Sequence, residues 1–258
     1  MIFYFSGTGN TKWAAERIAA ATQETLIFIP DVLDSECHFS IKEDERIGFC
    51  FPIHGWRPPF IVRDFIRKLK IDNSKGHFCY ALATCGDDVG LSFEYLNKDL
   101  ATIGMHTDSV FSLIMPESYV GFPFMDVDKS IKRDEKKEKG VEELKNLIQD
   151  IIDRKQNVRK VNESHWPRIN SNVIGSLFLS KMVTDRPFHV EERPCVKCGI
   201  CADVCPVGNI KGGLGQMPEW QHNGLCTTCF ACYHYCPHHA IEFGSKTKNK
   251  GQYFFHKK

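Results

Sequence analysis

The sequence lacks the long apolar run of a membrane-spanning helix, since about 20 consecutive apolar residues are needed to cross a bilayer. Its best candidate, residues 173–179, contains a glycine and a serine and is closely followed by Lys181. It also lacks a charge excess, because 33 Lys and Arg residues balance 32 Asp and Glu residues, which gives no electrostatic support to a nucleic-acid partner. No basic segment precedes the apolar residues 2–5, so we expect no secretory leader, no membrane span and a cytoplasmic location.

The first 157 residues alternate between short apolar segments and amphipathic ones. Five apolar segments predict β-strands, at residues 2–5, 25–29, 46–51, 77–84 and 109–115. Four segments with apolar residues at helical spacing predict helices, at residues 10–21, 60–69, 91–103 and 141–152. Near-continuously apolar strands that alternate with helices are typical of a parallel sheet covered on both faces. We therefore expect a doubly wound α/β domain whose ligand binds at the carboxyl ends of the strands.

Three further parts follow this domain. We interpret residues 158–188 as a connector, residues 189–244 as a smaller cysteine-rich domain and residues 245–258 as a basic tail. The connector is expected to contain one short helix at residues 172–182, with Val173, Leu177 and Phe178 directed inward. The tail is polar and is expected to be mobile. The histidines of the cysteine-rich domain at positions 234, 238 and 239 are expected at its surface.

Eight of the twelve cysteines lie within 42 residues and form an internal repeat. Each copy reads Cys-x2-Cys-x2-Cys-x3-Cys-Pro, and the second copy follows the first by 31 residues. The two-residue gaps bring three thiolates together in a tight loop, and the three-residue gap directs the fourth thiolate elsewhere. Zinc ribbons also use Cys-x2-Cys pairs, but a zinc ion takes only four ligands and rarely three successive cysteines at this spacing. The pattern therefore favours iron–sulfur clusters over zinc.

The two cysteine motifs resemble those of the bacterial two-cluster ferredoxins, over residues 189–244. The resemblance implies a small α+β domain that holds two [4Fe–4S] clusters and transfers single electrons at low potential. In that family the fourth cysteine of each motif ligates the other cluster. The first cluster would then bind the thiolates of Cys195, Cys198, Cys201 and Cys236. The second cluster would bind those of Cys226, Cys229, Cys232 and Cys205.

A second motif, Ser-Gly-Thr-Gly-Asn-Thr at residues 6–11, lies between the first predicted strand and the first predicted helix. Amides at a helix N-terminus point toward an anion, and the helix dipole favours negative charge there. The glycines let the backbone close around a phosphate, and Ser6, Thr8 and Thr11 offer hydroxyl donors. The dinucleotide fingerprint is not met, because Lys12 stands where its third glycine would be, and the Walker pattern also fails. Such a hydroxyl-rich loop favours a phosphomonoester over a pyrophosphate.

This loop matches the phosphate loop of the flavodoxins, and residues 1–157 resemble that family. The resemblance implies an FMN cofactor and a five-stranded parallel sheet in the order 2-1-3-4-5. The FMN phosphate would contact Ser6, Gly7, Thr8, Gly9, Asn10 and Thr11. Two loops, after the third and fourth strands, would contact the flavin ring. They consist of Pro52, Ile53, His54, Gly55 and Trp56, and of Thr84, Cys85, Gly86, Asp87, Asp88 and Gly90.

Single residues of the ring loops carry further expectations. Gly55 would allow a peptide to turn toward the flavin N5, as in the family, and Trp56 would either stack on the ring or cover the neighbouring proline turn. The second loop lacks the aromatic residue that many flavodoxins place on the outer ring face, which would leave that face open to a substrate or partner. His54 and Cys85 are the candidate catalytic residues, although a small buried thiol is more often inert packing.

Together the two parts resemble the fused flavodoxin–ferredoxin proteins of anaerobes. The resemblance implies electron transfer between two [4Fe–4S] clusters and FMN, as a relay between a redox protein donor and an acceptor. The alternative is a ferredoxin-dependent FMN reductase, an oxidoreductase that acts on a small organic substrate. The sequence has no NAD(P)H fingerprint, so both functions need an outside source of electrons. A homodimer is left open.

Overall fold

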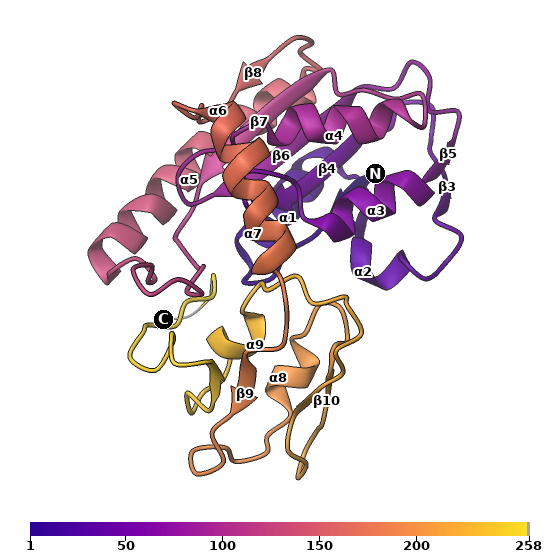
Figure 1. Cartoon of the computed structure of the whole chain (residues 1–258). Helices are drawn as coiled ribbons and strands as arrows, with labels where there is room; N and C mark the ends of the chain where they lie inside the picture. Colours follow the sequence, from indigo (N-terminus) through magenta and orange to yellow (C-terminus); the bar gives the residue numbers. More distant parts are fainter. Residues whose placement is uncertain (257–258) are drawn as a thin grey trace.

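A parallel sheet forms the larger part of the protein, whose computed structural model describes residues 1–256 (Figure 1). Its six strands, in spatial order, are β2 (Leu26–Phe28), β1 (Ile2–Tyr4), β4 (Ile47–Pro52), β6 (Cys79–Cys85), β7 (Ser109–Ile114) and β8 (Arg159–Lys160). The first five confirm the predicted order 2-1-3-4-5. The prediction of five strands is wrong by one, because β8 consists of two exposed residues without an apolar pattern.

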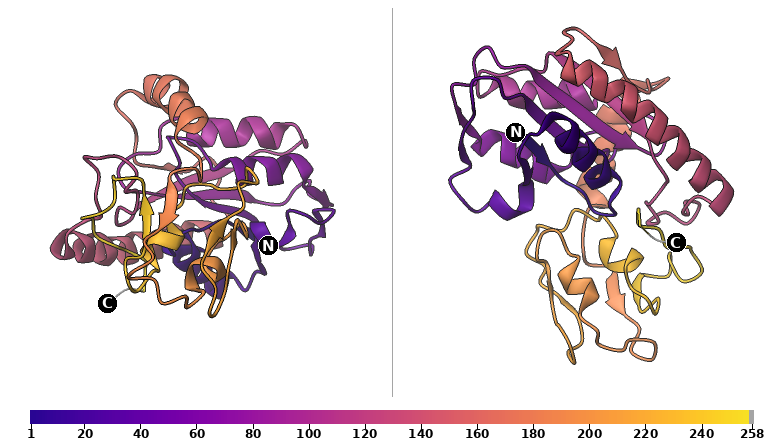
Figure 2. Two further views of the ribbon diagram at one scale, coloured as in Figure 1. Left: turned by 60° about the horizontal axis from the view of Figure 1, so that its bottom comes forward. Right: turned by 180° about the vertical axis from the view of Figure 1, so that it is seen from behind.

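Helices cover both faces of the sheet (Figures 1 and 2). They are α1 (Asn10–Thr22) and α5 (Ser130–Ile152) on one face, and α3 (Phe60–Lys68) and α4 (Ser92–Ala101) on the other. Trp13 of α1 and Leu147 of α5 share a core with one side of the strands, while Phe65 of α3 and Phe93 of α4 pack on the opposite side. Burial on both faces explains why these strands are almost continuously apolar.

Three short elements lie at the edge of this domain and were not predicted. Helix α2 (Ile29–Val32) follows β2, and strand β3 (His38–Ser40) pairs in parallel with β5 (Lys70–Asp72). Each of these strands has only three residues, with polar side chains at two of the positions. They are too short for a periodic pattern to identify them.

The connector forms a longer helical segment than expected. It consists of α6 (Pro167–Ile169), a π-helical turn η1 (Asn170–Ile174) and α7 (Gly175–Lys181), and it runs across the front of the sheet domain in Figure 1. Phe178 points inward as predicted and packs on Tyr119 and Phe122. The prediction is wrong for Val173 and Leu177, whose side chains are 64% and 62% exposed.

The cysteine-rich domain lies below the sheet in Figure 1. Its elements are β9 (Phe188–Val190), α8 (Ile200–Asp203), β10 (Ile210–Lys211), β11 (Glu219–Trp220), α9 (Ala231–His234) and β12 (Ile241–Phe243). Strands β9 and β12 pair antiparallel, as do β10 and β11. Phe188, Phe230 and Phe243 pack together in its core. This is the small α+β domain that the resemblance to the two-cluster ferredoxins implies.

The C-terminal tail and His234 differ from the expectation. The tail is not free, because Tyr253 and Phe255 are buried against the sheet domain, at 2% and 8% exposure. His234 is also buried, at 1% exposure, and its Nε2 donates to the Ser118 carbonyl (2.7 Å) while its Nδ1 accepts from the Tyr253 amide. His238 and His239 are exposed as expected. None of the helices within residues 1–256 combines the length and apolar composition of a membrane span.

Candidate functional site

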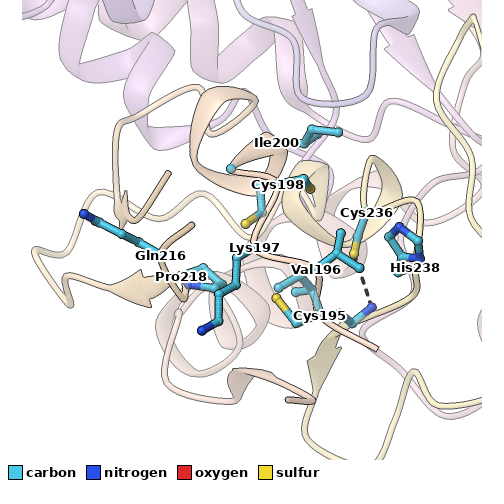
Figure 3. A pocket seen from close by; sticks show the side chains of 13 residues that line it. Cys195, Val196, Lys197, Cys198, Ile200, Gln216, Pro218, Cys236 and His238 are labelled. Atoms are coloured by element: carbon cyan, nitrogen blue, oxygen red, sulfur yellow. Dashed lines mark hydrogen bonds between the residues drawn. The ribbon is translucent and has the colours of Figure 1, made fainter. Parts of the chain in front are cut away.

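Four thiols of the cysteine-rich domain surround one cavity (Figure 3). Cys195 and Cys198 lie in the loop before α8, Cys201 lies on α8, and Cys236 follows α9. The structure therefore brings the last cysteine of the second repeat to the first three of the first repeat. This is the set of four residues that the sequence predicts for the first cluster.

The four thiols are arranged around a shared cavity. Within residues 1–256, no group of three or more His, Cys, Asp or Glu side chains is arranged to hold one metal ion. The four thiols instead line the walls of a shared cavity. A [4Fe–4S] cubane presents a separate iron to each of four thiolates, so a cavity between the thiols is what such a cluster requires.

The remaining four cysteines of the repeat, at positions 205, 226, 229 and 232, are neighbours too. Burial raises the pKa of Cys226 to about 12, and the nearby Cys229 and Cys205 thiols contribute to the rise. Burial raises the pKa of Cys229 to about 11, again with a contribution from Cys205. Burial also raises the pKa of Cys232, with contributions from the other three. The last cysteine of the first repeat thus joins the second set, and metal binding there must displace protons.

Backbone amides donate hydrogen bonds to the sulfur atoms of both sets. The Asn209 amide donates to Cys205 Sγ (3.3 Å), the Thr228 amide to Cys226 Sγ (3.4 Å) and the Ala240 amide to Cys236 Sγ (3.2 Å). Hydrogen bonds to the charged form of a group stabilise that form. The loops around the cysteines are therefore suited to thiolate ligands.

The predicted phosphate loop, residues 6–11, joins β1 to α1. Gly9 adopts a positive φ of 98°, and its amide donates to Ser6 Oγ (3.2 Å). Thr11 Oγ1 lies 2.7 Å from Thr84 Oγ1, which connects the loop to the end of β6. The first amides of an α-helix have no partner within the helix, so those at the start of α1 are available to an anion. Together with the hydroxyl groups, they are a donor set that fits the phosphate of FMN.

The two predicted ring loops meet at the carboxyl end of the sheet. A Cβ added to Gly90 would lie 2.6 Å from the Cβ of Trp56, so the loops are in direct contact. Gly55 and Trp56 both have positive φ, at 58° and 57°. Gly86 lies against Glu117, whose Oε1 accepts from the amides of the next two residues. Glu117 belongs to the loop after β7, which the sequence did not identify as part of the site.

The connector also reaches both ring loops. Ser171 Oγ donates to the Trp56 carbonyl (3.1 Å) and accepts from the Leu91 amide (2.8 Å). Arg57 Nε donates to the Ser171 carbonyl (2.9 Å). These contacts were missed because Ser171 lies 80 residues beyond Leu91 and belongs to no motif. Ser171 and Arg57 hold the connector against the site.

The candidate catalytic residues have surroundings that suit packing. Burial lowers the pKa of His54 to about 4, so its imidazole is neutral at neutral pH. Burial raises the pKa of the Cys85 thiol, and its Sγ donates to the Asp87 and Leu113 carbonyls (3.7 and 3.9 Å). A neutral, buried thiol is a poor nucleophile. Burial therefore keeps both groups neutral at neutral pH.

The phosphate loop touches the second set of cysteines directly. A Cβ added to Gly7 would lie 2.5 Å from the Cβ of Cys229 and 3.1 Å from its Sγ. The loop after β7 reinforces this contact, because Val120 is buried in the core of the cysteine-rich domain and Tyr119 packs on Phe230 (5.3 Å). The Tyr119 hydroxyl is buried and has no hydrogen-bond partner among the described residues. The two domains thus meet where the two predicted cofactor sites meet.

Comparisons with known protein families find one match in each half of the chain. Residues 1–103 match the flavodoxin domain family, and residues 194–241 match the 4Fe-4S dicluster domain family. Among solved structures, the Trp repressor binding protein from Bacillus subtilis is 14% identical, with a TM-score of 0.30, over 44% of this chain and 83% of its own. No curated protein matched the sequence.

The fold and the family matches define an iron–sulfur flavoprotein of electron transfer. The two matches, a flavodoxin domain followed by a 4Fe-4S dicluster domain, are the combination and order of a fused flavodoxin–ferredoxin protein. A flavodoxin domain implies FMN, and a dicluster domain implies iron–sulfur clusters and redox partners.

Proposed function

We propose that the protein relays electrons between redox partners through two [4Fe–4S] clusters and FMN within one chain. The observation that carries this proposal is the contact of Cys229 with Gly7, which brings the second cysteine set to the phosphate loop. When bound, each cluster exchanges one electron, and FMN accepts one or two. Joining the centres in one chain raises the effective concentration of each at the other.

The two cysteine sets have unequal positions in this relay. The second set adjoins the sheet domain through the contact of Cys229 with Gly7, whereas the first set surrounds a cavity that only residues of the cysteine-rich domain line. We expect an external donor to deliver electrons to the first set. The second set then passes them across the domain contact toward the flavin loops. The cytoplasmic location expected from the sequence remains a prediction.

Anaerobic purification followed by rapid mixing with a reductant tests the relay. We expect about eight iron and eight sulfide ions for each FMN, from two [4Fe–4S] clusters. The bleaching of the cluster absorbance should precede that of the flavin. A colourless protein, or a flavin that stays oxidised while the clusters are reduced, would contradict the proposal.

The alternative, a reductase for a small organic molecule, has less support from the site. Burial keeps His54 and Cys85 neutral, and Phe178 of the connector lies against Gly55. A steady-state assay with a ferredoxin-reducing system distinguishes the two functions. Stoichiometric consumption of an organic acceptor would favour the reductase, whereas rapid exchange with carrier proteins alone favours the relay.

A further inference from the structure

The last part of the described chain, residues 252–255, lies between the two domains, and we name it the strap. The side chain of Gln252 donates to the carbonyls of Tyr233 (2.6 Å) and Cys236 (2.7 Å). The ring of Phe254 stacks on Tyr235 at a centroid distance of 4.2 Å. The strap is therefore anchored to α9, which contains Cys232, and to the turn that follows this helix.

Alternate side chains of the strap reach the flavodoxin domain. The Tyr253 hydroxyl donates to Asn10 Oδ1 (2.6 Å), and the Phe255 amide donates to the Thr8 carbonyl (2.8 Å). The Phe255 ring stacks on Trp13 of α1 at 4.9 Å. Lys137 of α5 donates to the Phe255 carbonyl (2.9 Å) and lies over its ring. Tyr253 and Phe255 are buried by these contacts, at 2% and 8% exposure.

The strap and the second cysteine set hold the same loop from two sides. Gly7 is in contact with Cys229, and a Cβ added to Gly9 would lie 3.0 Å from the Cβ of Phe255. Two residues of the loop, Thr8 and Asn10, bond to the strap directly. The distance between the phosphate loop and Cys229 is thus fixed by contacts on both sides of the loop.

We propose that the strap is a positioning element that sets the distance between the second cluster and FMN, with Tyr253 and Phe255 as its positioning residues. This inference rests on the proposed relay, since positioning matters only if electrons cross this contact. Electron tunnelling falls steeply with distance, so a small separation of the domains slows transfer without removing either cofactor. The side chains of Tyr253 and Phe255 contact the flavodoxin domain, whereas Gln252 bonds to the Cys236 carbonyl, so changes at Tyr253 and Phe255 should leave cluster assembly intact.

The test compares Phe255→Ala with Phe254→Ala in the full-length holoprotein. The two changes remove the same ring from neighbouring positions, but Phe255 packs on the flavodoxin domain and Phe254 on the cysteine-rich domain. Hydrogen exchange of residues 6–13 and the rate of flavin reduction after cluster reduction are measured in each. We expect Phe255→Ala to speed loop exchange and slow flavin reduction by about tenfold or more, which corresponds to roughly 1.4 kcal/mol. Phe254→Ala keeps the contacts with the flavodoxin domain and the Gln252 anchor, so we expect a smaller effect on both than in Phe255→Ala.

Tyr253→Phe is the second variant, because it keeps the ring and removes only the hydrogen bond to Asn10. We expect a smaller effect in the same direction, with iron and FMN contents as in the wild type. Loop exchange and transfer rates that match the wild type in both Phe255→Ala and Tyr253→Phe would overturn the proposal, as would loss of FMN from either variant. If the wild type itself shows no transfer from cluster to flavin, the proposed function fails and the strap proposal fails with it, whereas unchanged variants alone reject only the strap.

Discussion

Gly7 and Gly9 illustrate that one motif can place two glycines for different reasons. Gly9 has a φ of 98°, which side chains other than glycine adopt only with strain. Gly7 has no such conformation, but any side chain there would meet Cys229. The sequence explains the glycines through phosphate binding, whereas the structure adds contact with the second domain at Gly7.

Gly7→Ala tests this contact at the scale of one methyl group. The added Cβ would lie 2.5 Å from Cys229 Cβ, and overpacking of this kind typically costs about 1–3 kcal/mol. We expect a lower apparent midpoint of thermal unfolding and slower flavin reduction. Gly213→Ala is the matched control, because a Cβ there meets no atom within 4 Å. An unchanged midpoint and rate in Gly7→Ala would show that the domains do not meet at this glycine.

His54 gives a prediction about pH. Its folded-state pKa of about 4 lies below the ordinary value of 6.5, so the unfolded chain binds more protons between these values. His54 therefore lowers stability as the pH falls through this window and has no such effect above it. We expect its ring nitrogen signals in NMR spectra to stay those of neutral imidazole from about pH 5.5 to 7.5, with His54→Gln to assign them. A titration midpoint of the His54 ring above pH 6 would contradict this burial.

At the scale of elements, the connector is more than a link between domains. Gly175 begins α7 and lets this helix approach the Gly55 carbonyl, while Phe178 covers Gly55 one turn later. Ser171 of η1 joins both ring loops. The helical segment therefore packs on the predicted flavin site along most of its length.

Gly175→Ala separates this packing from helix propensity. Alanine in a helix is favoured over glycine by about 1 kcal/mol, but its Cβ would lie 2.3 Å from the Gly55 carbonyl oxygen. We expect the clash to dominate, with a net loss of about 1–2 kcal/mol and weaker FMN retention, measured by thermal unfolding and by dialysis. Ser180→Ala, at an exposed position of the same helix, should be neutral. A more stable Gly175→Ala protein would mean that α7 is not pressed against Gly55.

The apolar strands β1, β4, β6 and β7 could be predicted from the sequence because burial on both faces makes nearly all of their residues apolar. Strand β8 could not, since its two residues are exposed and join the sheet only through β7. The phosphate loop and the cysteine repeat were likewise local motifs. Ser171, Glu117 and Phe255 were missed because each reaches the site from a distant part of the chain.

At the scale of the whole molecule, the crossed cysteine sets make the two repeats interdependent. Cys205 belongs to the first repeat and lies with the second set, while Cys236 belongs to the second repeat and lies with the first set. Neither repeat can complete its own set of four. Damage to one fourth cysteine should therefore affect the cluster associated with the other repeat.

The pair Cys205→Ser and Cys236→Ser tests both the crossing and the order of the relay. Each variant should retain roughly half of the iron, since one of two clusters is lost or weakened. Cys205→Ser removes a ligand of the set that touches the flavodoxin domain, so we expect it to stop flavin reduction by the remaining cluster. The Cys236→Ser variant should retain flavin reduction by its remaining cluster. Each variant is the control for the other. Iron analysis and EPR spectroscopy report the clusters that remain, and rapid mixing reports the rate of flavin reduction. Equal rates of flavin reduction in the two variants would contradict the proposed order of electron transfer through the two cysteine sets.

The contact between Tyr253 and Asn10 spans 243 residues, and this separation has a consequence for biosynthesis. A ribosome releases the N-terminal domain first, and domains commonly begin to fold as they emerge. During that interval the nascent flavodoxin domain has no neighbour over Thr8 and Gly9. Cofactor loading can therefore precede closure, because Tyr253 and Phe255 are synthesised long after the loop that they cover.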